Sequence, residues 1–217
     1  MLKELRFTDI FVLSAIFFGY ATYTSTIYFL SGTSDFSSVT DFSQRDNYLG
    51  FAIQLCLFGL AFIYLRFIKY GFSVLKFQIT LKSTIFSVIL FCFLALLMDG
   101  YFWLLDVFGV AYPASSYIDT SIIIYSLFNG FYEEFFFIAL CLSVNPKIIK
   151  GVFIYSLFVR FSFHTYQGVA SALGITLILG CIYFLLYERL RVKNLYPYFL
   201  SHALADIFGL GILYYIF

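Results

Sequence analysis

Residues 83–103, STIFSVILFCFLALLMDGYFW, form an apolar stretch that decides the class of the fold. The hydrocarbon core of a bilayer is about 30 Å thick and a helix rises about 1.5 Å per residue. A spanning helix therefore needs about 20 mostly apolar residues. This stretch meets that requirement, and it predicts a transmembrane helix.

Six other stretches have a similar character, although the fifth span is short. The sequence predicts spans at residues 10–30, 48–68, 83–103, 121–143, 151–165, 169–187 and 198–217. The expected fold class is all-α, a polytopic transmembrane helix bundle with about seven spans. Residues 1–120 would hold three spans with their loops, and residues 121–217 would hold the other four.

The composition of the whole chain supports a membrane protein. Hydrophobic residues make up 62% and charged residues 12% of the 217, and the mean hydropathy is +0.94. Soluble domains are about 45–50% apolar and about 25% charged. The net charge is only +1 and no basic run is present, so the chain lacks the charge pattern of a nucleic-acid-binding protein. The expected surroundings are the lipid bilayer.

The cysteines predict neither a disulfide framework nor a metal site. All four lie inside apolar segments and none has CxxC spacing. We interpret them as small apolar residues of the helix bundle. They are Cys56, Cys92, Cys141 and Cys181.

The basic residues predict the orientation in the membrane, because Lys and Arg collect in cytoplasmic loops. Eleven of the thirteen lie before the first span or after the second, fourth and sixth, which places them on one side. The N-terminus is therefore expected in the cytoplasm and the C-terminus outside. The eleven are Lys3, Arg6, Arg66, Lys69, Lys76, Lys82, Lys147, Lys150, Arg189, Arg191 and Lys193.

Ionisable side chains at membrane depth mark the candidate site. Each costs at least about 2.5–3.5 kcal/mol on insertion scales, so it needs a functional or structural reason. All clear cases fall in the fourth, fifth and seventh predicted spans, and they include both histidines of the chain. The six residues are Glu133, Glu134, Arg160, His164, His202 and Asp206.

The spacing of these residues predicts that they can meet. Arg160 and His164 are separated by four positions, as are His202 and Asp206, so each pair lies on one helix face. Glu133 and Glu134 are adjacent and point about 100° apart, so only one of them can be central. Interhelical hydrogen bonds that only stabilise the bundle, a proton or solute pathway, and catalysis all remain open from the residues alone.

Three motifs in this region resemble those of the CAAX prenyl protease and bacteriocin-processing family of intramembrane endopeptidases, also called CPBP or Abi. They are the Glu133-Glu134 pair in GFYEEFFFIAL, His164 in FVRFSFHTYQG, and His202 with Asp206 in SHALADI. Their order and their placement on predicted helices agree with the family. The resemblance covers residues 121–209 and identifies residues 121–217 as the family-like catalytic bundle.

Two positions depart from the family pattern. The family has an Arg four residues after the second Glu, where this chain has Ile138. An aromatic residue is common four positions before the second-motif His, where this chain has Arg160. We expect Arg160 to supply the missing cation from a facing helix, because Arg is well suited to a buried carboxylate.

The resemblance implies hydrolysis of a peptide bond. A glutamate, helped by His164, would activate a water molecule, while His202 and Asp206 would polarise the carbonyl group or stabilise the oxyanion. No metal or other cofactor is implied. A zinc site made of Glu133, His164 and His202 is the alternative, since catalytic zinc takes three protein ligands and a water molecule.

The substrate implied is a small peptide or a protein tail, and the expected location is a bacterial cell membrane. Family members process prenylated tails or peptide precursors, or confer bacteriocin immunity. The competing hypothesis is a non-catalytic scaffold or immunity protein of the same fold that binds a partner membrane protein, which the loss of the motif Arg at Ile138 favours. A small transporter is less consistent with the sequence, because no internal repeat is visible.

Overall fold

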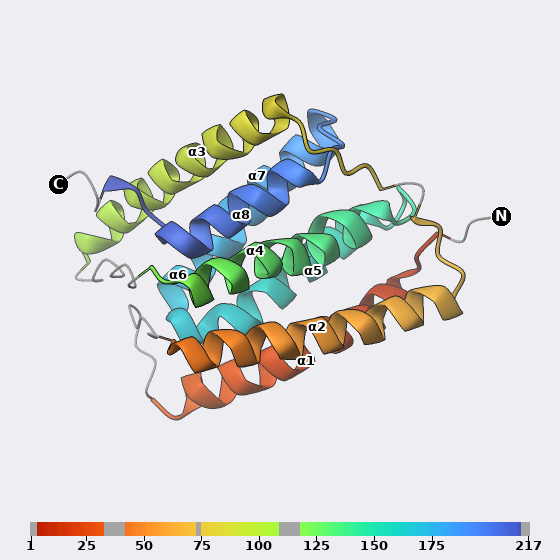
Figure 1. Ribbon diagram of the computed structural model, residues 1–217, viewed down its shortest axis with the longest axis horizontal. Coiled ribbons are helices and arrows are strands. Elements are labelled where there is room, and N and C mark those ends of the chain that lie inside the picture. The colour runs from red at the N-terminus through yellow and green to blue at the C-terminus, as the bar shows by residue number, and fades with distance from the viewer. Residues whose placement is uncertain (1–3, 33–41, 73–74, 109–117, 214–217) are drawn as a thin grey trace.

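The computed structural model describes residues 4–32, 42–72, 75–108 and 118–213 as a bundle of helices (Figure 1). The predicted all-α class is confirmed, with no strand assigned among these residues. The first three helices are α1 (Phe7–Leu30), α2 (Gln44–Phe67) and α3 (Leu81–Asp106). Their polar N-terminal caps include Ser43 before α2 and Thr80 before α3.

The fourth helix changes character just after the two glutamates. It begins as α4 (Thr120–Glu134), continues as a π-helix (Phe135–Leu140) and ends in a 3-10 turn (Cys141–Ser143). The backbone N–H of Cys141 bonds the carbonyl oxygen of Phe136, five residues earlier. Such π-helical segments are frequent at functional sites.

The remaining helices complete the bundle. They are α5 (Ile149–His164), α6 (Val169–Gly174), α7 (Gly180–Phe184) and α8 (Tyr196–Phe208). Helices α6 and α7 belong to one continuous helical run, because π-helical turns (Ile175–Leu179 and Leu185–Arg189) follow each of them. A 3-10 turn (Thr165–Gln167) connects α5 to this run.

Five helices are long and apolar enough to cross a membrane among the residues described. They span Phe7–Leu30, Gln44–Phe67, Leu81–Asp106, Thr120–Ser143 and Val169–Arg189. Helices α5 and α8 are shorter, with 16 and 13 residues. The number of spans and the side of the N-terminus stay predictions.

The predicted seventh span needs a correction. It was expected over residues 198–217, but α8 begins at Tyr196 and ends at Phe208. The next residue, Gly209, has φ +90°, a conformation that glycine adopts without steric cost and that ends the helix. The sequence remains apolar past this point, so hydropathy alone does not show where the helix ends. Residues 214–217 lie outside the described part of the chain.

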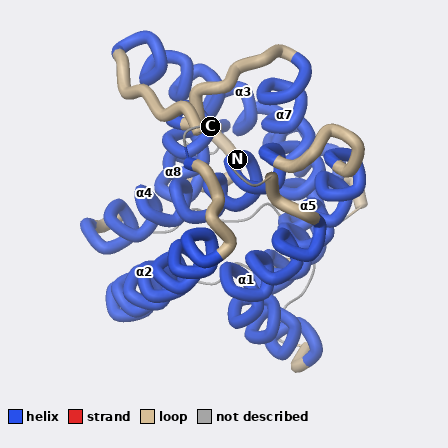
Figure 2. The backbone as a smooth tube through the Cα atoms, turned by 90° about the vertical axis from the view of Figure 1, so that its right-hand side faces the viewer, coloured by secondary structure: helices blue, strands red, loops and turns tan. Residues whose placement is uncertain are grey.

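Helix α4 is central to the bundle. It packs against α8 on one side and α2 on another, while α1 packs against α5 and α3 against α8 (Figures 1 and 2). Helices from the predicted 1–120 and 121–217 segments therefore contact one another directly. Tyr132 connects α4 to α1, because its hydroxyl donates to the carbonyl oxygen of Phe17 at 2.6 Å.

Gly130 allows α4 and α8 to approach closely. A Cβ atom added there would lie 2.5 Å from the carbonyl oxygen of Phe199 and 2.7 Å from the backbone N of Ala203. Real Cβ atoms do not come this close to backbone atoms. The absence of a side chain at Gly130 thus determines how near the glutamates of α4 lie to His202 of α8.

We expect Gly130→Ala to lower the free energy of unfolding by roughly 1–3 kcal/mol, the usual cost of overpacking. Gly59→Ala in α2 is the matched control, because nothing lies within 4 Å of a Cβ added at that position. The control should be neutral or slightly stabilising, since alanine is the better helix former. Unfolding in detergent measures both, and equal stability of the two variants would contradict the close helix contact.

Candidate active site

Glu134 is the centre of a buried charged cluster contributed by α4, α5 and α8. Its carboxylate accepts from Nη2 of Arg160 at 2.7 Å (Oε1) and 2.9 Å (Oε2). Oε1 also lies 2.7 Å from Nδ1 of His202. All three side chains are buried, and Arg160 is only 1% exposed. The pairing of Arg160 with a motif glutamate, predicted from the sequence, is confirmed.

Arg160 therefore supplies from α5 the positive charge that Ile138 cannot supply from α4. The guanidinium carbon also lies 4.1 Å from the centre of the Phe137 ring, which favours a buried cation. Ile138 lies in the π-helical segment and packs in the apolar core. A buried carboxylate with a bonded guanidinium avoids the large cost of an isolated buried charge.

Glu133 has a different environment from its neighbour. Its Oε1 accepts from Nδ2 of Asn129 at 3.1 Å. Its Oε2 lies 3.7 Å from Nε2 of His202 and has no hydrogen-bond partner among the described residues. A buried oxygen without a partner is unusual and costly. This oxygen is the one carboxylate atom of the Glu pair that is free to bind a water molecule or a substrate group.

His202 is held between the carboxylates of the cluster. With Nδ1 donating to Glu134, Nε2 faces Glu133 and lies 3.6 Å from Oδ1 of Asp206. The short bond to this ring is made by Glu134 and not by Asp206, which shares a helix face with His202. Both groups remain beside the imidazole, one on each nitrogen.

His164 lies outside the group of ligating atoms that are within 4.8 Å of one another, which consists of Glu133, Glu134 and His202 among the described residues. It is the last residue of α5 and is buried. Its Nδ1 is 2.8 Å from the carbonyl oxygen of Arg160, so Nδ1 donates, and in the neutral ring Nε2 carries the lone pair.

Two amide side chains that the sequence pattern did not single out complete the cluster. Asn129 donates through Nδ2 to Glu133 and also to Oδ2 of Asp206 at 2.8 Å. Gln54 of α2 donates through Nε2 to Oδ1 of Asn129 at 2.5 Å, which fixes the orientation of the amide. The only signal for Asn129 is its position one helical turn before Glu133.

The ligating atoms that lie close together differ from the zinc set predicted from the sequence. The predicted zinc alternative, Glu133 with His164 and His202, is not the set that the structure brings together. Glu134 uses both oxygens for Arg160, and His202 uses Nδ1 for Glu134. Glu133 Oε2 and His202 Nε2 remain, and Oδ1 of Asp206 lies 3.6 Å from that nitrogen. No step is assigned to a metal, and the zinc alternative stays a prediction.

The apolar helices and the buried acid–base cluster together define the class as a multi-pass helical membrane protein with a polar site inside its bundle. Residues 115–208 match the family model described as type II CAAX prenyl endopeptidase, Rce1-like. The matched segment contains all six predicted site residues, and it confirms the family resemblance predicted from the motifs. No curated protein and no solved structure matches the chain.

Proposed function

We propose that the chain is an intramembrane endopeptidase that hydrolyses a peptide bond in a small peptide or protein tail. The similarity to CAAX-type endopeptidases over residues 115–208 supports a protease. The observation that carries the proposal is the unpartnered Oε2 of Glu133 beside Nε2 of His202. A base and a donor placed around one buried position are what peptide hydrolysis needs.

Glu133 is the general base in this proposal. A water molecule bound between Oε2 of Glu133 and Nε2 of His202 gives a proton to Glu133 as its oxygen bonds to the carbonyl carbon. The carbon–nitrogen bond then breaks, and the proton passes from Glu133 to the leaving amine. Glu134 is less suited to be the base, because Arg160 and His202 already occupy its oxygens.

The other site residues stabilise the developing negative charge. A His202 that donates to Glu134 through Nδ1 and carries a second proton on Nε2 is a donor for the oxyanion. Asp206, beside Nε2, favours this charged form. His164 keeps the role that the family resemblance implies, which is to help activate the water molecule, and its ring is oriented by the bond from Nδ1 to the carbonyl oxygen of Arg160.

Cleavage of peptides by the purified chain tests the proposal. The full-length protein in proteoliposomes is incubated with a library of short peptides, and the products are identified by mass spectrometry. We expect new C-termini with the wild type and none with His202→Ala. A stable partner membrane protein or an immunity phenotype that persists in Glu133→Ala and His164→Ala, without any cleaved peptide, would instead support the scaffold hypothesis.

Asn129 positions Glu133 and Asp206, so its replacement should lower kcat with little change in KM. Asn129→Ala removes both donated bonds. Asn129→Asp keeps the shape but turns an oxygen toward two carboxylates, so we expect it to be at least as harmful as alanine. Asn145→Ala and Asn145→Asp are the controls, because Asn145 follows the 3-10 turn Cys141–Ser143 and donates to the exposed Glu4. They should leave kcat unchanged. An active Asn129→Asp variant would contradict this role.

A further inference from the structure

One polar side chain of α2 is hydrogen-bonded into the catalytic cluster. Nε2 of Gln54 donates to Oδ1 of Asn129 at 2.5 Å. Nδ2 of Asn129 in turn donates to Glu133 at 3.1 Å and to Asp206 at 2.8 Å. Gln54 is thus connected through a single amide to two carboxylates of the site. It lies outside residues 115–208, the segment that matches the family.

The direction of the Asn129 amide matters to both carboxylates. An amide presents N–H donors on one side and an acceptor oxygen on the other. With Nδ2 toward Glu133 and Asp206, the oxygen Oδ1 faces α2 and needs a donor there. Turned over, the amide would place its oxygen against carboxylate oxygens, which only accept when ionised. A donor on α2 therefore keeps the amide in the direction that serves the site.

The surroundings of Gln54 fix the direction of its own amide. Nε2 has two acceptors, because the hydroxyl oxygen of Tyr125 lies 3.4 Å away in addition to Oδ1 of Asn129. Oε1 is buried and has no hydrogen-bond partner among the described residues. A buried oxygen without a partner has a free-energy cost. The donor is thus directed toward Asn129 although the other end of the amide is left unpaired.

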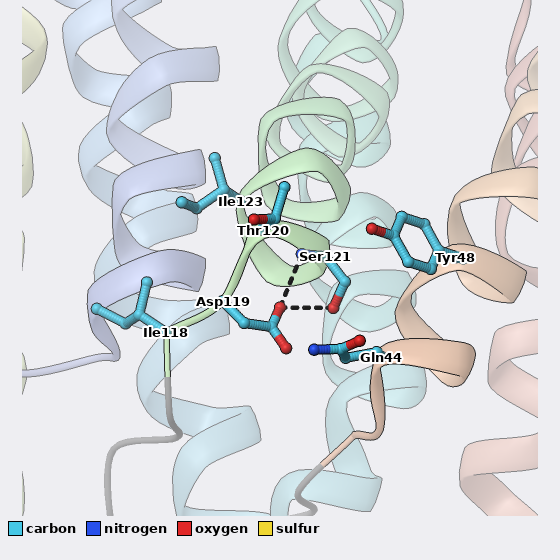
Figure 3. Close-up of a pocket in the computed structure, with 7 residues that line it drawn as sticks. All are labelled: Gln44, Tyr48, Ile118, Asp119, Thr120, Ser121 and Ile123. Atoms are coloured by element: carbon cyan, nitrogen blue, oxygen red, sulfur yellow. Dashed lines mark hydrogen bonds between the residues drawn. The ribbon is translucent and has the colours of Figure 1, made fainter.

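The starts of α2 and α4 lie side by side. Figure 3 shows Gln44 and Tyr48 of α2 facing the first turn of α4, where they and Ser121 line the same hollow. Nδ2 of Asn47 donates to Oγ of Ser121 at 3.0 Å, and both of these side chains are buried. This bond sets the register of the two helices before they reach the cluster.

Close packing continues along the two helices on both sides of Gln54. A Cβ atom added at Gly50 would lie 3.0 Å from Cε2 of Tyr125, so the tyrosine ring lies directly against the α2 backbone. One turn after Gln54, the ring centre of Phe58 lies 5.3 Å from that of Phe131. These contacts hold the amide of Gln54 in place against α4.

We propose that Gln54 is a positioning residue of the site and that α2 is part of the catalytic unit. Gln54 acts through Asn129, whose amide holds Glu133 and Asp206 in place only while its oxygen faces a donor. An interhelical hydrogen bond that only stabilised the bundle would leave kcat unchanged. The role in hydrolysis rests on the proposed function, whereas the effect of Gln54 on the Asn129 amide does not.

Single and double replacements in the full-length protein test whether Gln54 acts through Asn129. With a peptide that the wild type cleaves, Gln54→Ala should lower kcat about 10–10²-fold and leave KM unchanged, as expected for a misplaced catalytic group. Added to Asn129→Ala, the same replacement should have almost no further effect on kcat, because the connection is already removed. A wild-type kcat in Gln54→Ala, or effects of the two replacements that multiply, would overturn the inference.

Gln54→Glu provides a pH dependence that a merely structural role would not produce. The protonated carboxyl group can donate to Oδ1 of Asn129, whereas the ionised group only accepts and favours the reversed amide. The titratable groups around this amide are Tyr125 and Glu133 of α4 and Asp206 of α8. Relative to the wild type at the same pH, kcat of Gln54→Glu should fall at least tenfold as the pH rises and recover as it is lowered.

The same pH series in the Asn129→Ala background separates orientation of the amide from the added charge. We expect the relative kcat of Gln54→Glu to lose its pH dependence there. A pH dependence that persists would mean that the new charge acts directly on the carboxylates, and it would overturn the inference. Gln78→Ala and Gln78→Glu are the matched controls, because the Gln78 side chain is exposed and its backbone makes the bonds to Asn194. Both should keep the wild-type kcat at every pH.

Unfolding of these variants in detergent distinguishes the inference from the proposed function, because it needs no substrate. Gln54→Glu should become less stable relative to the wild type as the pH rises, and only when Asn129 is present. A change in stability that does not depend on Asn129 would overturn the connection through the amide. The expected dependence on Asn129, found in a protein that cleaves no peptide, would support the connection and contradict the hydrolysis instead.

Discussion

Replacing Glu133 with Gln is expected to lower the rate of peptide cleavage by about 10²–10⁴-fold, the typical contribution of a general base. The amide has nearly the same shape and can still accept from Asn129, so the bundle should remain folded. It cannot take a proton from water at neutral pH. The loss should therefore appear in kcat, with unfolding in detergent showing an intact protein.

Glu188→Gln is the matched control for this substitution. Glu188 pairs with Lys193 at 2.7 Å in the segment before α8, and its side chain is 24% exposed. Exposed pairs contribute about 0–1 kcal/mol, so this variant should keep both stability and activity. A Glu133→Gln protein that cleaves peptide at a rate close to that of Glu188→Gln would mean that Glu133 is not the base.

Removal of Arg160 should have the largest effect on stability. Arg160→Met leaves the Glu134 carboxylate buried without its guanidinium partner. Breaking a buried pair in this way typically costs about 3–5 kcal/mol. Activity should fall as well, because a Glu134 that loses Arg160 interacts more strongly with His202 and changes the charge on the ring. Unfolding in detergent and kcat measure the two effects.

A double-mutant cycle shows whether the loss comes from the charge pair. The variant Arg160→Met with Glu134→Gln removes both charges, so it should be more stable than Arg160→Met alone. Lys193→Met, which removes the cation of the partly exposed Glu188 pair, is the control and should change stability by less than about 1 kcal/mol. A double variant that is less stable than Arg160→Met would show that Arg160 acts through packing instead.

The sequence predicts the charged part of this site because placing a charged side chain inside a membrane has a high free-energy cost. Each of Glu133, Glu134, Arg160 and His202 is conspicuous in an apolar span for that reason, and helical spacing is enough to predict that they meet. The pairing of Arg160 with one of the two glutamates is predicted because Ile138 replaces the motif Arg and Arg suits a buried carboxylate. The structure shows that the partner is Glu134. The closeness of α4 and α8 at Gly130 is what turns this pattern into a compact cluster.

Other parts of the site depend on packing that local patterns do not reveal. The free-energy cost of placing an amide such as Asn129 or Gln54 in a membrane span is lower than that of placing a charge there. The sequence alone therefore does not mark these amides as site residues, and their roles become visible only with their partners. Gln54 lies in a helix without any family motif. The end of α8 at Phe208 is equally hidden, because Gly209 interrupts the helix within continuous apolar sequence.

The most direct test of the proposed chemistry is a single turnover in heavy-oxygen-labelled water. Direct attack by a water molecule that Glu133 activates predicts one labelled oxygen in the new C-terminal carboxylate of the peptide and none in the Glu133 side chain. Both are read by mass spectrometry of the product and of the digested enzyme. Label in the Glu133 carboxylate would contradict the account, because it would show that Glu133 attacks the peptide itself.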